Sequence, residues 1–121
     1  MKAAAWEKSI IDQCKAVGTM KPAFKATIST LADILEQRDA TYAQFVREGS
    51  RLVIERVSDR GAVNSAKNPL YVIWNELNSQ ALAYWRDLGL TPKGLKAISD
   101  DALKPEKKDA FVDKIDQLLG R

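Results

Sequence analysis

The most constraining feature of this sequence is one long amphipathic segment, roughly Pro22 to Glu48. Apolar side chains recur along it at helical spacing for about seven turns of 3.6 residues, until Gly49 ends the pattern. A helix of this length exceeds the usual globular helix, so we expect it to pack against more than one partner. The residues on its predicted inner face are Phe24, Ile28, Leu31, Leu35, Tyr42 and Phe45 or Val46.

Shorter helical patterns flank this segment. Ahead of it, an apolar stripe ends at Gly18, a typical helix stop. Behind it, Asn68-Pro69 places a capping side chain before a first-turn proline, and Gly89 closes the helix that follows. We therefore predict a mainly α protomer of about five helices, over Ala3–Val17, Pro22–Glu48, Pro69–Leu88, Pro92–Ile98 and about Pro105–Leu119.

Between residues 50 and 67 the helical period disappears. Leu52 to Val57 is rich in β-branched residues and is followed by the turn-forming run Ser58 to Gly61. This predicts a small β-hairpin or an extended loop. Because an isolated two-stranded hairpin is marginally stable in water, it must lean on a helix or on a neighbouring chain. The segment is the first indication of an oligomer.

The length of 121 residues favours a single domain, 1–121. Its predicted parts are a helical hairpin (1–49), the extended segment (50–67), a central helix with a short helix (68–98) and a C-terminal helix (99–121). The longest apolar runs, such as residues 70–74, fall far short of the roughly 20 residues that span a bilayer. We therefore expect no membrane association and no signal peptide. A lone cysteine, Cys14, favours a reducing cytoplasm.

Catalytic patterns are weak throughout the sequence. There is no histidine, the commonest general base and metal ligand. Gly89 and Gly94 have the spacing of a phosphate-binding loop, but Leu95 stands where the lysine of that loop is needed. We predict no catalytic residue, no metal site, no cofactor and no enzymatic activity.

Charge points to a polyanionic partner. The formal charge is +3, and residues 1–25 account for it with five lysines against two acidic residues. Arginines on the extended segment form a second cationic group suited to phosphate contacts. Three surplus charges support only weak binding by a single copy, so DNA binding would need several copies together. The predicted DNA-binding residues are Lys8, Lys15, Lys21, Lys25, Arg56 and Arg60.

The predicted helix over Pro69–Leu88 carries more apolar side chains than a single stripe along one face can hold. Tyr71, Leu82 and Trp85 point away from its main face, and we expect a small monomer to have difficulty burying both sides. This favours contacts between subunits. The residues predicted to hold the helix within or between protomers, as the oligomer interface, are Leu70, Trp74, Leu77, Tyr84 and Trp85.

Taken in order, these landmarks resemble the bacteriophage terminase small subunits. The resemblance covers about residues 4 to 98, and its most specific part is Asn-Pro about twenty residues before Leu-Gly-Leu-Thr-Pro. The matching landmarks are Trp6, Gly18, Tyr42, Gly49 with its Leu-Val segment, Asn68-Pro69 and Leu88-Gly89-Leu90-Thr91-Pro92.

The resemblance implies a function that the residues alone do not. Such subunits are helical protomers that form homo-oligomeric rings, bind double-stranded viral DNA at the packaging-initiation site and regulate a large ATPase and nuclease subunit in the host bacterial cytoplasm. Ring formation would multiply the modest charge of each protomer. Two alternatives remain open: a small helical transcription regulator, and a helical adaptor that binds only a protein partner.

Overall fold

The computed structural model describes residues 1–99 and 118. Within them the chain is mainly helical, with one two-stranded sheet, as predicted. Residues 92–99 form a short helix, and the predicted fifth helix, about Pro105 to Leu119, lies outside the described residues except at position 118. The other elements are α1 (Ala3–Val17), the 3-10 turn η1 (Pro22–Phe24), α2 (Lys25–Arg47), β1 (Val53–Val57), β2 (Val63–Lys67) and α3 (Pro69–Asp87).

Helix α1 is connected to α2 by a tight turn. Gly18 caps α1 in the left-handed conformation, at φ 80°, where its amide binds the carbonyls of the last turn. The buried Thr19 then donates its hydroxyl hydrogen to the carbonyl oxygen of Leu88 at 2.8 Å. This hydrogen bond fastens the turn to the end of α3.

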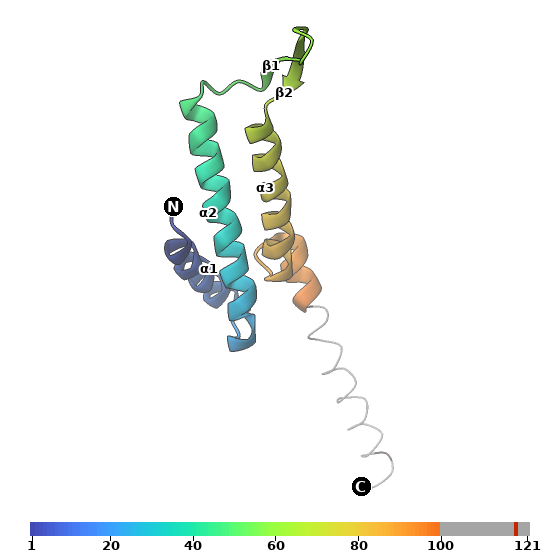
Figure 1. Ribbon diagram of the computed structural model, residues 1–121. Helices are drawn as coiled ribbons and strands as arrows, with labels where there is room; N and C mark the ends of the chain where they lie inside the picture. The colour runs from blue at the N-terminus through green and yellow to red at the C-terminus, as the bar shows by residue number, and fades with distance from the viewer. Residues whose placement is uncertain (100–117, 119–121) are drawn as a thin grey trace.

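Helix α2 lies between two other helices, as its length predicted. It packs against both α1 and α3 (Figure 1). Its buried side chains occupy a stripe broad enough to face both neighbours. The sequence predicted that this helix begins at Pro22. In the structure Pro22 opens the 3-10 turn η1, and the α-helix begins at Lys25. The central cluster contains Ile10, Cys14, Ile28, Leu31, Ala32, Leu35, Ala81 and Leu88.

Helix α3 runs antiparallel to α2. Near the hairpin, the rings of Phe45 and Tyr71 have centroids 6.1 Å apart, and those of Tyr42 and Trp74 are 5.8 Å apart. The Tyr71 and Trp74 rings stack on each other at 6.0 Å. This aromatic row holds the two helices together beyond the end of α1, and aromatic pairs of this kind contribute about 0.5–1.5 kcal/mol each beyond burial.

Strands β1 and β2 form an antiparallel hairpin with Val57 opposite Val63 at the tip and Val53 opposite Lys67 at the base. The hairpin stands beyond the ends of α2 and α3, away from α1 (Figure 1). Most of its side chains are exposed; Ile54 and Ala66 are half-buried. The extended segment is therefore a hairpin rather than a loop, and the helices of its own protomer leave most of it uncovered.

Asn68 joins the hairpin to α3. Its side-chain oxygen accepts a hydrogen bond from the Leu70 amide at 3.0 Å, which is the predicted N-cap. Its side-chain amide donates to the carbonyl oxygen of Arg51 at 2.8 Å, and its backbone amide donates to that of Leu52 at 2.8 Å. The residue is 7% exposed, so these hydrogen bonds are largely shielded from water.

Asn68→Asp should separate these two roles, because aspartate keeps the capping oxygen and loses the donor to Arg51. We expect a loss of about 1–2 kcal/mol in unfolding free energy for Asp, and more for Asn68→Ala, which loses both contacts. Urea unfolding followed by circular dichroism measures the difference. Equal losses for the two variants would contradict the capping role.

Candidate nucleic-acid interface

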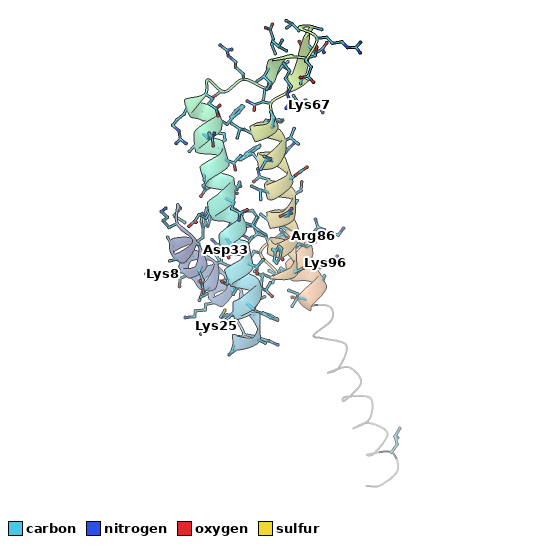
Figure 2. The ribbon with its side chains drawn as sticks, in the orientation of Figure 1. Lys8, Lys25, Asp33, Lys67, Arg86 and Lys96 are labelled. Atoms are coloured by element: carbon cyan, nitrogen blue, oxygen red, sulfur yellow. The ribbon has the colours of Figure 1, made fainter. Side chains whose placement is uncertain are left out.

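The first half of the predicted interface is a basic N-terminal surface. The side chains of Lys8, Lys15, Lys21 and Lys25 are all exposed. The first two lie seven residues apart on α1, hence on one face of the helix, and the last two lie on either side of η1. Figure 2 shows Lys8 on α1 and Lys25 at the start of α2. Exposed lysines in this arrangement can contact phosphates without costly desolvation.

The position of α1, and so of its lysines, is fixed by Arg38 on α2. The Arg38 guanidinium lies over two indole rings, 5.4 Å from the Trp6 centroid and 5.9 Å from that of Trp85. It also binds the Oδ1 atoms of Asp39 at 3.1 Å and Asn78 at 3.3 Å. Because Trp6 belongs to α1 and Trp85 to α3, this one cation links all three helices.

Asp39 completes this junction. Its Oδ2 accepts hydrogen bonds from the Trp6 indole at 2.7 Å and from the amino-terminal ammonium at 3.2 Å. Partial burial raises the pKa of Asp39, but the hydrogen bonds from Trp6, the ammonium group and Arg38 outweigh it, and the pKa lies below its ordinary value of 3.8. The charged form of Asp39 is thus the one that the fold prefers.

The second half of the predicted interface is the hairpin. Arg56 lies on β1 directly opposite Asn64 on β2, and Arg60 lies in the turn that connects the strands. All three are exposed. Arg51 and Lys67 add positive charge at the base of the hairpin, where Figure 2 shows Lys67. Residues 50–67 carry a net positive charge, because they contain four cationic side chains and only two acidic ones, Glu55 and Asp59.

The structure does not bring the two halves together within one protomer. Lys21 and Lys25 lie at the start of α2, whereas the hairpin follows its end. At 1.5 Å per residue, a helix of 23 residues separates them by about 35 Å. The six predicted residues therefore form two separate cationic surfaces in a single copy.

The predicted interface residues on α3 contribute largely to the protomer itself. Leu77 is buried, and Tyr84 and Trp85 pack against the central cluster. Leu70 and Trp74 are half-buried, the latter against Tyr42. Sequence reasoning placed Trp85 away from the main apolar stripe, and helical periodicity gives no information about Arg38, which lies over that ring.

An apolar groove remains open on the outer face of α3. It has a volume of about 640 Å³ and lies between the base of the hairpin and the helix. Leu52, Val53 and Tyr71 supply apolar walls, and Val72 is 37% exposed. Sequence analysis missed this groove because strand and helix residues meet there only after folding. The residues that line it are Leu52, Val53, Lys67, Tyr71, Val72, Asn75, Glu76, Ser79 and Gln80.

Gly94, considered above for its spacing from Gly89, has a packing role. A side chain at this position would collide with the backbone at Arg86, so the short helix of residues 92–99 can approach the end of α3 only with glycine there. Gly89, for its part, adopts the left-handed conformation at φ 73° just after α3, so each of the two glycines has its own local structural role.

Within residues 1–99 and 118, no helix is long and apolar enough to cross a membrane. The fold and surface define a small, mainly helical protein with a projecting hairpin and exposed cations at both ends. A family model described as phage terminase, small subunit, matches residues 3–102. The chain belongs to this family, as its landmarks predicted. No curated protein and no solved structure matched it.

Membership of the family implies a role in phage genome packaging. Small subunits of terminases are generally non-catalytic, and they work in the cytoplasm of the host during packaging. Viral DNA and a large subunit are the partners that the family implies in general.

The lowered pKa of Asp39 predicts a pH-dependent stability. Because its folded pKa lies below 3.8, its contribution is fully present above that pH and is lost as the pH falls through the lower folded value. We expect Asp39→Asn to lose about 1 kcal/mol near pH 6 and to approach the parent protein below pH 3.8. Urea unfolding across this range measures it. Asp33→Asn, exposed on the same helix, is the control, and an equal pH profile for both variants would contradict the assignment.

Proposed function

We propose that this chain is the small subunit of a phage terminase, which binds double-stranded viral DNA at the packaging-initiation site and regulates the large ATPase and nuclease subunit. The observation that carries the proposal is the family match over residues 3–102. The exposed lysines of the N-terminal surface and the exposed arginines of the hairpin support the DNA-binding part. They offer phosphate contacts that require no catalytic group.

Self-association is part of this proposal. A formal charge of +3 per copy gives a weak field, whereas a ring of copies presents many phosphate contacts at once. The N-terminal lysines and the hairpin arginines of one protomer are separated by the length of α2. We propose that a DNA duplex contacts both kinds of surface because several neighbouring copies surround it. We propose a closed homo-oligomeric ring, in which different surfaces of identical subunits meet and the rotation from one copy to the next closes.

The contact between copies is proposed to use the valine face of the hairpin, which we define as Val53, Val57 and Val63. These side chains are 57%, 71% and 60% exposed and lie on one side of the ribbon. Val53 also lines the groove of α3, so the apolar surface continues onto that helix. The helix itself has only three charged residues, which suits an interface: Glu76, Arg86 and Asp87.

The interface proposal predicts that Val57→Asp will weaken self-association. A carboxylate placed in an apolar contact must be desolvated without a partner, which costs several kcal/mol. We expect light scattering to show a smaller mass for this variant at the same concentration. Val17→Asp, which changes an exposed valine on α1, should keep the parent mass. A parent protein that is monomeric at high concentration would refute the ring.

The DNA-binding proposal predicts that the double variant Lys21→Glu with Lys25→Glu binds duplex DNA at least ten-fold more weakly at low salt, because each copy loses two phosphate contacts and gains two repulsions. Fluorescence anisotropy against salt concentration measures the affinity and its salt slope. The matched control is Lys93→Glu with Lys96→Glu, an equal change in charge at two exposed lysines of the short helix of residues 92–99. Equal losses for the two pairs would reject the N-terminal surface as a specific contact.

A further inference from the structure

The two faces of the hairpin differ in chemistry. The antiparallel register places Ile54, Arg56, Asn64 and Ala66 on one face of the ribbon. The valine face lies on the other side, and it also carries Glu55, Ser65 and Lys67. The first face, which we call the reading face, therefore holds a guanidinium and an amide side by side and no carboxylate. The two half-buried residues of the reading face, Ile54 and Ala66, lie toward the base of the hairpin.

From this arrangement we infer that the hairpin is a DNA-reading ribbon, which enters the major groove and contacts base edges with Arg56 and Asn64. The inference rests on the proposed DNA binding and deepens it, because it assigns sequence recognition to the hairpin and general phosphate attraction to the N-terminal lysines. Arg60, in the turn, is placed to contact a phosphate at the groove edge.

The dimensions of the hairpin agree with this role. Five-residue strands rise about 3.3 Å per residue, which makes a ribbon about 17 Å long, and the two strands lie about 4.8 Å apart. A two-stranded ribbon fits the major groove, which is about 12 Å wide, but not the minor groove, which is about 6 Å wide. The hairpin projects beyond α2 and α3, so the helices do not block its approach (Figure 1).

The chemistry of the pair suits base recognition. Arginine binds the O6 and N7 atoms of guanine with two hydrogen bonds, and asparagine binds the N6 and N7 atoms of adenine in the same way. Directly opposite residues of an antiparallel pair have Cβ atoms about 5 Å apart. Successive bases are about 3.4 Å apart along the helix axis, so Arg56 and Asn64 can reach neighbouring base pairs. Both side chains are exposed.

Selection from a random-sequence duplex library tests the inference with the full-length chain. The parent protein should enrich a short motif that contains guanine and adenine. Arg56→Lys keeps the charge but replaces the rigid planar fork of arginine with a single ammonium on a flexible stem, which holds the O6 and N7 atoms of guanine less well. We expect this variant to keep its affinity for random DNA and its salt slope, while its discrimination between the selected and a scrambled duplex falls about ten-fold. Asn64→Ala should lose discrimination similarly.

Two controls make the result specific. Ser65→Ala changes the valine face beside Asn64 and should leave discrimination unchanged. Replacing each guanine of the selected motif by 7-deazaguanine removes the N7 acceptor from the major groove only, so binding by the parent should weaken more than binding by Arg56→Lys. Circular dichroism and light scattering check that every variant keeps the parent fold and mass.

The outcomes separate the two proposals. Unchanged discrimination in both Arg56→Lys and Asn64→Ala overturns the reading role of the hairpin, as does insensitivity of the parent protein to 7-deazaguanine. DNA binding without any enriched motif also overturns it and leaves the proposed DNA binding standing. Failure of the parent to bind any duplex at low salt refutes the proposed DNA binding itself, and with it the ribbon.

Discussion

The structure depends on the double packing of α2. Ile28, Leu31, Ala32 and Leu35 are buried because α1 covers one part of the stripe and α3 the other. A single helix in water is marginal, and neither partner alone would cover a stripe this wide. The Arg38 guanidinium, which lies over one indole ring from each partner, marks where this three-helix arrangement ends.

Beyond Arg38, α2 packs against α3 alone, and the buried core becomes smaller. The core narrows to the aromatic row, where Tyr42 remains 50% exposed. The chain then leaves the helices as a hairpin whose valine face is uncovered. One end of the protomer thus holds the buried three-helix core, while the other projects as a hairpin with exposed valines and exposed cations. This asymmetry is the physical basis for proposing that copies associate at the hairpin end and collect DNA between them.

Sequence reasoning was most successful where one local rule decides the conformation. Gly18 and the capping Asn68 were predicted in the roles that the structure gives them, and the hairpin and the short helix of residues 92–99 were also expected. It was weakest at contacts between elements. Trp85 was predicted to hold its helix within or between protomers, and helical periodicity did not reveal that Arg38 of another helix lies over its ring; a subunit contact there stays a prediction. The predicted DNA contacts were grouped by charge, and nothing in the charge pattern reveals that α2 holds them apart.

The sequence by itself determined the helices, the turn residues and the family, because periodicity, capping and glycine conformation act over a few neighbouring residues. Only the tertiary structure decided which faces remain open: the groove on α3, the valine face, and the pairing of Arg56 with Asn64. These depend on strand register and helix packing, which bring together residues distant in the chain through contacts that no local pattern encodes.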